Sequence, residues 1–297
     1  MNIDEARAQA LDRLIDAYTA ELREADDDNA AVTLAYSHRL HTSWRTILRM
    51  LPVSPGWRVL DVGCGFGILG FELAVNIPVP IVGVELNPDF VQHAEGLRER
   101  VAQLGLLTPG SSLEFEVGDV RALPFDDETF DLVFIREVLQ FLPDPLTAVA
   151  EVLRVLRPGA YLCISDTDDQ LRITWPPPIQ AFERLVAAVT QVQLDRGGDR
   201  QTGRKLTTYL RSVGFEIASV VVLPEAQHRV VDSGDAERAL VVEQLHAARH
   251  RVILSGVIEP SAFDADLAMV ERQEPFEEFR LNGRIVVLGR RPQTPGP

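Results

Sequence analysis

Apolar and polar positions in the first fifty residues follow the period of an α-helix. Apolar residues recur at intervals of three and four over residues 3–25, and a polar run at 26–29 ends this pattern. A second helical pattern follows and stops before Pro52, because proline cannot continue a helix. We therefore expect residues 1–52 to form two amphipathic helices, which together make an N-terminal helical cap.

From residue 57 onward, short apolar runs alternate with helical patterns. The apolar runs cover residues 58–62, 81–85, 113–117, 130–135 and 160–165. The helical patterns between them lie near 68–76, 88–105, 120–124 and 144–156. Continuous apolar strands separated by helices are typical of a parallel sheet with both faces covered, so the chain is expected to be an α/β protein.

The second half of the chain is expected to complete this sheet. Helices are predicted at 179–195 and 203–213, and further strands at 215–223 and 283–290. Between these two strands lie about 60 residues with helical patterns near 235–255 and 261–272, far more than a usual connection. We interpret residues 224–282 as a helical insertion that forms a lid over the acceptor site. Residues 53–223 with 283–291 then form the core.

Composition and charge narrow the range of partners. Acidic residues outnumber basic ones by 44 to 29, which gives a formal net charge of −15 at pH 7. Nucleic-acid-binding proteins concentrate lysine and arginine, so we expect no nucleic-acid partner. No apolar run approaches the roughly 20 residues of a membrane span, and the acidic N-terminus is unlike a secretory signal. We expect a cytoplasmic protein, monomeric or homodimeric, without a membrane partner.

The two cysteines, Cys64 and Cys163, are predicted to remain reduced. They fall near the first and fifth predicted strands, whose backbones would lie about 9–10 Å apart at about 4.8 Å per strand spacing. That separation exceeds the roughly 7 Å limit for a disulfide. Two such residues do not make a metal site, and no metal is expected.

The first strand of the sheet reads RVLDVGCGFG and so runs into a glycine-rich turn. Glycines at Gly63, Gly65 and Gly67 let the backbone turn tightly and approach a ligand closely. Asp61, at the carboxyl end of the strand, is placed to accept hydrogen bonds from a cationic or hydroxyl-bearing ligand. Glu85 ends the next strand, where a carboxylate suits a bidentate contact with ribose hydroxyls.

A nicotinamide-dependent oxidoreductase is one alternative for this turn. Gly65, Gly67 and Gly70 satisfy the G-x-G-x-x-G pattern of dinucleotide-binding folds. However, the turn already begins at Gly63, two residues after an acid. The first glycine of the literal pattern falls too late for a strand that ends at Val62. The oxidoreductase is therefore the weaker interpretation.

Further motifs follow the turn in a fixed order. They are Gly118-Asp119, Leu123-Pro124-Phe125 with Phe130-Asp131, Leu142-Pro143-Asp144-Pro145, Leu156-Arg157-Pro158-Gly159, Gly198-Asp199, Gly203-Arg204 and Gly214-Phe215. With these motifs, residues 57–165 resemble the class I S-adenosylmethionine (SAM)-dependent methyltransferases, particularly the quinone-biosynthesis and natural-product branch. The resemblance implies a Rossmann-like seven-stranded sheet in the order 3-2-1-4-5-7-6, with strand 7 antiparallel.

The resemblance also implies which residues hold the cofactor. The turn from Gly63 to Gly67, with Cys64 and Gly65 inside it, would wrap the methionine and ribose part of SAM. Glu85 would bind the ribose hydroxyls.

The remaining implied contacts lie at the two ends of the cofactor. Leu86 would flank the adenine, Asp119 would meet its amino group, and Val120 would stack beside it. Arg136, just after the fourth strand, would line the methionine end. We expect SAM as the cofactor.

No motif assigns a catalytic base. Methyl transfer from a sulfonium is an in-line displacement that needs alignment, and a base is needed only for a hydroxyl or a carbon acid. Many relatives carry a histidine after the fourth strand, where this chain has Gln140. The other weak candidates are His38 and His41 on the second helix and Asp166 beyond the fifth strand.

The sequence therefore predicts methyl transfer from SAM to an O or N atom, less readily a C atom, of a small organic molecule. The N-terminal helices and the insertion are expected to enclose an apolar acceptor pocket. One alternative keeps SAM but acts as a cyclase, a decarboxylase or a binding protein, because the expected histidine is missing. An NAD-dependent oxidoreductase is more remote, and methylation of protein or RNA is disfavoured by charge.

Overall fold

The computed structural model describes residues 4–51 and 53–293, except for the side chains of residues 40–43 and 50. Its helices are α1 (Glu5–Glu24), α2 (Asp28–Met50), α3 (Ile68–Ala74), α4 (Pro88–Gln103), α5 (Pro145–Val155), α6 (Gln180–Asp195), α7 (Leu206–Val213), α8 (Ala236–Leu254) and α9 (Pro260–Glu271). Its strands are β1 (Val59–Val62), β2 (Pro80–Glu85), β3 (Ser112–Val117), β4 (Phe130–Arg136), β5 (Leu156–Asp166), β6 (Arg172–Trp175), β7 (Glu216–Val231) and β8 (Phe276–Arg290). Most predicted helices and strands are present within a few residues of their predicted positions.

The strands form one mixed sheet. Strands β3, β2, β1, β4 and β5 lie in that order and pair in parallel. Strand β8 is antiparallel to β5 on one edge and to β7 on its other edge. When β7 and β8 are counted as the sixth and seventh strands, this is the predicted order 3-2-1-4-5-7-6. The carboxyl ends of the parallel strands therefore meet at one edge, where ligands bind in open α/β sheets.

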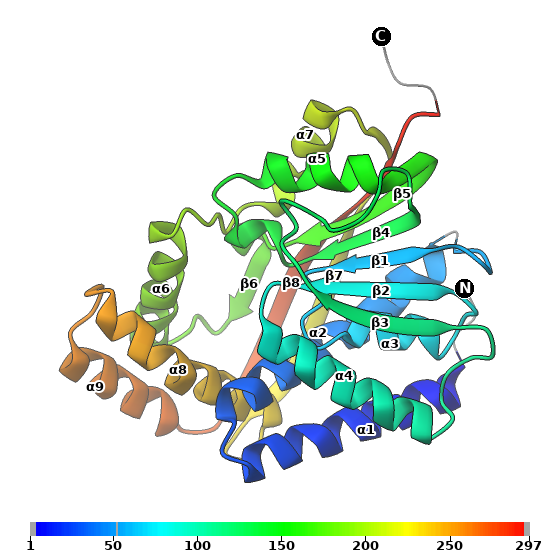
Figure 1. Ribbon diagram of the computed structural model, residues 1–297. Helices are drawn as coiled ribbons and strands as arrows, with labels where there is room; N and C mark the ends of the chain where they lie inside the picture. The colour runs from blue at the N-terminus through cyan, green and yellow to red at the C-terminus, as the bar shows by residue number, and fades with distance from the viewer. Residues whose placement is uncertain (1–3, 52, 294–297) are drawn as a thin grey trace.

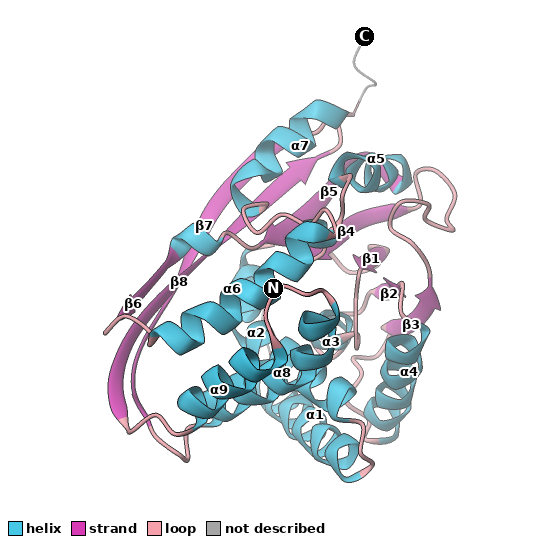
Figure 2. Cartoon of the chain, turned by 90° about the vertical axis from the view of Figure 1, so that its left-hand side faces the viewer, coloured by secondary structure: helices cyan, strands magenta, loops and turns pink. Residues whose placement is uncertain are grey.

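The last two long strands extend further than predicted. Strand β7 continues to Val231 and β8 begins at Phe276, and the two strands pair over this whole length. Figure 2 shows the ribbon running beyond the rest of the sheet, with the short strand β6 beside β8. The sequence did not predict β6. The segment between β7 and β8 is consequently shorter than 224–282, although both of its predicted helices, α8 and α9, are present.

The predicted short helix at 120–124 is wrong, because this segment is a turn. The carboxylate of Asp119 accepts a hydrogen bond from the backbone N–H of Arg121 at 2.9 Å, and Ala122 N–H donates to the Asp119 carbonyl. These local bonds, with Pro124 directly after them, favour a turn over a helix.

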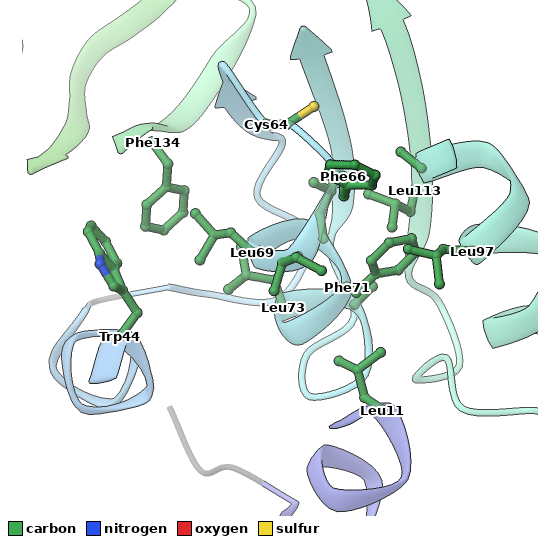
Figure 3. Close-up of a cluster of buried hydrophobic side chains, with 14 of the residues drawn as sticks. Leu11, Trp44, Cys64, Phe66, Leu69, Phe71, Leu73, Leu97, Leu113 and Phe134 are labelled. Carbon is green, nitrogen blue, oxygen red and sulfur yellow. The ribbon is translucent and has the colours of Figure 1, made fainter. Parts of the chain in front are cut away.

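Two hydrophobic cores lie on the two faces of the sheet, between the strands and the helices that Figure 1 shows on either side. Helices α1 to α4 lie on one face, and α5 and α7 lie on the other. Figure 3 shows Leu11 of α1 beneath Phe71 of α3, and Trp44 of α2 beside Phe134 of β4. The two N-terminal helices thus pack along one face of the sheet. Both cysteines are buried and free, as predicted.

A third core lies away from the sheet. Helices α6, α8 and α9 pack around Leu185, Val252 and Phe263, and Figure 1 shows them as a separate group. The apolar side chains of the segment between β7 and β8 are therefore largely directed at α6. Within the described ranges, no helix is both long and apolar enough to cross a membrane.

Candidate functional site

The glycine-rich turn after β1 adopts backbone angles that favour glycine. Gly63, Gly65 and Gly67 have φ values of +66°, +55° and +75°. A Cβ at Gly63 would lie 2.3 Å from a methyl group of Val138, and one at Gly67 would lie 2.3 Å from the Phe115 ring. A Cβ at Gly65 would meet no atom within 4 Å. The outer glycines are needed for packing, whereas the middle one faces open space.

Glu85 holds this turn against the end of β2. One carboxylate oxygen accepts the backbone N–H of Gly65 at 3.0 Å, and the other accepts the backbone N–H of Asn87 at 3.0 Å. Each oxygen has a further lone pair that can accept a ligand hydroxyl. The next side chain, Leu86, is 63% exposed although it is apolar. A hydrogen-bonding acid, an open glycine and an exposed apolar side chain therefore meet at one place, which fits a ribose and an aromatic base.

A buried acid and a buried arginine lie behind the turn. Asp61 at the end of β1 is 3% exposed, and burial raises its pKa from 3.8 to about 7. Arg136 at the end of β4 opposes this rise, while Glu85 adds to it. The Arg136 guanidinium lies 5.8 Å from the centre of the Trp44 ring, and burial lowers its pKa. Asp61 and Arg136 can therefore pair with the ammonium and the carboxylate of a ligand whose end is zwitterionic.

Asp61 should make the folded state less stable as pH rises. Between about pH 4 and pH 7 the unfolded chain has lost this proton while the folded chain retains it, so the free energy of unfolding falls across that window. The shift corresponds to at most about 4 kcal/mol. We expect Asp61→Asn to remove most of this fall and to be more stable than the parent at pH 7.5.

Urea unfolding of the ligand-free protein at pH 5 and pH 7.5 measures this effect. Asp126→Asn, at an exposed acid, is the matched control and should keep the parental pH slope. Equal slopes in Asp61→Asn and the parent would contradict the assignment.

The other residues that the resemblance places around the cofactor lie near this edge. Asp119 follows β3 and forms an ion pair of 2.5 Å with Arg121, which holds the pKa of its carboxyl below the ordinary value. Val120 is buried against the α5 side of the sheet. Cys64 is 5% exposed, and burial raises the pKa of its thiol. The cysteine therefore packs and is not a reactive thiolate.

The weak catalytic candidates differ in where they lie. His38 bonds to Asp12 at 2.9 Å and contacts Asp16 at 3.3 Å, so its ring joins α2 to α1. The side chain of His41 lies outside the part that the structure describes. Asp166 is fully buried, and its carboxylate accepts the backbone N–H groups of Gln140 at 3.1 Å and Thr167 at 2.8 Å. Burial raises the pKa of Asp166.

Gln140 contacts a residue that no sequence motif marks, Glu137. Its side-chain amide donates to Glu137 at 2.8 Å and accepts from Arg200 at 2.5 Å. Glu137 directly follows β4 with φ +57°, an angle that is uncommon for a residue with a Cβ. Burial raises the pKa of its carboxyl, and Arg284 donates to it at 3.2 Å. No motif marks Glu137, because its backbone angle and its arginine partner appear only in the folded chain.

Glu137 forms part of a polar pocket above the ends of β4 and β5. The hollow has a cavity volume of about 90 Å³ and is partly open to solvent. Its lining comes from α2, the end of β4, the segment from β5 to the start of β6, the loop before α7, and the β7–β8 ribbon. The lining residues are Tyr36, Arg39, Glu137, Thr167, Asp168, Asp169, Leu171, Arg172, Arg200, Glu225, Asn282, Gly283 and Arg284.

The prediction of an apolar acceptor pocket is therefore wrong for this hollow, because charged and polar side chains line it. That prediction places apolar side chains of the helices between the last two strands in its lining. Those helices pack on α6 instead, and the ribbon directs charged side chains inward. The pocket lies beside the glycine turn, because Val138, the neighbour of Glu137, packs on Gly63.

Comparison with known proteins identifies the family to which the chain belongs. Residues 53–214 match the family model described as a methyltransferase domain. The chain is 31% identical over 215 residues to a 37.1 kDa protein of transposon TN4556 from Streptomyces fradiae, covering 71% of this chain and 57% of that protein. It is 26% identical to the 27-O-demethylrifamycin SV methyltransferase of Amycolatopsis mediterranei, covering 82% and 80%. The chain spans little more than half the length of the first curated relatives that it matches.

Solved structures support the fold. A SAM-dependent methyltransferase from Methanosarcina mazei superposes with a TM-score of 0.51 at 19% identity, covering 82% of this chain and 95% of that one. At this identity the likeness concerns the fold alone. The family match over more than half of the residues, with the sheet order described above, is decisive. The chain belongs to the class I SAM-dependent methyltransferase family.

Proposed function

We propose that the chain transfers the methyl group of SAM to an O or N atom, less readily a C atom, of a small organic molecule. One observation carries the proposal: the open glycine turn held by Glu85 packs on Val138, and the residue next to Val138, Glu137, lines the polar pocket. SAM, when bound, supplies an electrophilic methyl group on a sulfonium. The chain's own residues would bind the cofactor at the turn and orient the acceptor in the pocket.

The proposed cofactor site follows the placements described above. Glu85 would hold the ribose and Leu86 would flank the adenine. Asp119 would meet the adenine amino group while it remains paired with Arg121. Asp61 and Arg136 would face the methionine end, where an ammonium and a carboxylate need opposite charges. The space at Gly65 supports this arrangement.

Oxygen is the acceptor atom that we favour. The relatives include O-methyltransferases of Aspergillus sclerotiorum and Penicillium expansum, besides the rifamycin enzyme. A hydroxyl acceptor must lose a proton, and a carboxylate whose pKa is raised by burial is suited to receive it. We propose Glu137 for this role, with Gln140 and Arg284 as positioning residues. No observation favours a cyclase, a decarboxylase or a nicotinamide enzyme.

Glu85→Gln should weaken SAM binding by about tenfold or more. The substituted amide directs an N–H₂ group at one of the two backbone N–H groups that the carboxylate now accepts. Glu114→Gln, at an exposed acid of β3, is the control and should bind SAM as the parent does. Calorimetric titration measures both. An unchanged dissociation constant in Glu85→Gln would remove Glu85 from the ribose.

The reaction itself is tested by following the formation of S-adenosylhomocysteine. The purified protein is incubated with SAM and pools of small phenols, alcohols and amines, and the product is measured by mass spectrometry. We expect product above the background without acceptor in at least one pool that contains hydroxyl compounds. Tight SAM binding without product in any pool would support the binding-only alternative.

A further inference from the structure

One face of the β6–β8–β7 ribbon forms a wall of the polar pocket. In the strand register, Asn282 of β8 lies opposite Arg172 of β6 on one edge and opposite Glu225 of β7 on the other. Directly paired residues share a face, as do residues two apart in a strand, so Arg284 and Arg280 point to the same side. Arginine is therefore the main charged residue type on this wall.

The acids of the pocket already have donors. Asp168 accepts two hydrogen bonds from Arg204 at 2.5 and 2.7 Å, and Arg204 does not line the pocket. Asp169 accepts two from Arg200 at 2.7 and 3.0 Å.

Of the remaining two acids, one is also engaged. Glu137 is held by Gln140 and Arg284. Glu225 is half-buried and lies across Asn282 from the exposed Arg172. Among the side chains that the structure describes, no carboxylate oxygen is both buried and without a hydrogen-bond partner. The acids of the pocket therefore do not require a bound cation.

Two arginines of the wall, in contrast, keep buried N–H groups without acceptors, although Arg284 donates to Glu137 and Arg280 donates to Glu237 through other nitrogens. The Nε groups of Arg284 and Arg280 are buried and have no hydrogen-bond partner, and the Arg284 side chain is 11% exposed. Arg284 donates to Glu137 at a length of 3.2 Å, long for a charged pair. It also repels the buried Arg136 electrostatically. A buried donor without an acceptor, and two nearby like charges, both cost free energy that a bound anion would recover.

We infer that the acceptor carries a compact anionic group, a carboxylate or a phosphate, and that Arg284 binds it in the polar pocket. The planar guanidinium can donate two parallel N–H bonds to either group. Bound in this way, the anion would anchor one end of the acceptor on β8 while the hydroxyl faces Glu137. The inference rests on the methyl transfer proposed above, because it names the acceptor class of the same pocket.

Three aromatic probes of similar size test the inference in calorimetric titrations of the full chain. They are 4-hydroxybenzoate, phenyl phosphate and the neutral 4-hydroxybenzamide. We expect at least one anion to bind about tenfold or more tightly than the amide. Arg284→Gln should abolish that preference, whereas Arg249→Gln, at an exposed arginine paired with Asp264 on the distant α8–α9 surface, should keep it. Comparison of the two anions distinguishes a carboxylate from a phosphate.

The other outcomes would overturn the inference. They are equal binding of the amide and the anions, no binding of either anion at millimolar concentration, or an anion preference that persists in Arg284→Gln. If Arg284→Gln fails to fold in a thermal unfolding control, Arg284→Lys decides. The lysine variant keeps the positive charge but cannot donate two parallel N–H bonds, so it should retain only part of the anion preference. Full retention of the preference would contradict the role of Arg284 in anion binding.

A SAM titration of the same samples separates this inference from the proposed function. Loss of SAM binding in Arg284→Gln with an intact anion preference would assign Arg284 to the cofactor and overturn the inference. If the parent protein prefers the anion but does not bind SAM, the anion site is supported and the proposed methyl transfer is contradicted.

Discussion

Gly65→Leu should abolish detectable SAM binding, at least about a hundredfold loss, while the protein remains folded. Gly65 is the only member of Gly63, Gly65 and Gly67 whose Cβ would meet no protein atom within 4 Å, so a side chain there begins in open space. It would fill the space beside the carboxylate of Glu85. The positive φ of +55° adds a cost of roughly 1–2 kcal/mol in stability. Titration with SAM and urea unfolding measure the two effects separately.

Gly105→Leu is the matched control for this experiment. Gly105 has φ +65° and equally open surroundings, but it lies beyond the end of α4 and away from the turn. It should show a similar loss of stability and parental SAM affinity. Parental affinity in Gly65→Leu would mean that the space at the turn does not hold the cofactor.

The second large effect is expected at Glu137. Glu137→Gln should slow methyl transfer to a hydroxyl acceptor by about a hundredfold, the usual contribution of a general base, with unchanged SAM affinity. The substitution keeps the shape and the contact with Gln140 but cannot take up a proton. In the parent, the rate should fall at low pH as Glu137 becomes protonated, at a pKa above the ordinary glutamate value because of burial. The variant should lose that pH dependence.

Glu128→Gln controls for the unusual backbone of this position. Glu128 also has φ +57°, but it is exposed, pairs with Arg291 and lies before the amino end of β4, at the opposite end of this strand from Glu137. It should transfer methyl groups at the parental rate with the parental pH profile. A parental rate in Glu137→Gln would exclude Glu137 as the base and leave a mechanism that needs alignment alone.

The parts of the fold that the sequence predicts well are those with strong local signals. The central strands β1, β2, β4 and β5 carry largely apolar runs, whereas the edge strand β3 alternates apolar residues with glutamates. Caps such as Asn87 before α4 and Gly214 after α7 fix helix ends. The outer half of the β7–β8 ribbon carries polar residues, such as Glu225 and Arg280, on the face toward the pocket. Its strand character depends on pairing between segments about 50 residues apart, which a local pattern does not reveal.

The cofactor side of the site is predictable for a related reason. The glycine turn and Glu85 are close in sequence to the strands that place them, so motif and position coincide. The acceptor side depends on residues brought together from distant segments. Arg284 meets Glu137 across 147 positions of sequence, and neither residue belongs to a motif. The polar character of the pocket therefore becomes visible only in the folded chain.

Calorimetric titration of the parent protein with SAM tests directly whether the glycine turn binds the cofactor. We expect one binding site at this turn, a dissociation constant well below millimolar, and competition by S-adenosylhomocysteine. NADH should not compete. Absence of binding at millimolar SAM, or displacement of SAM by NADH, would contradict this expectation.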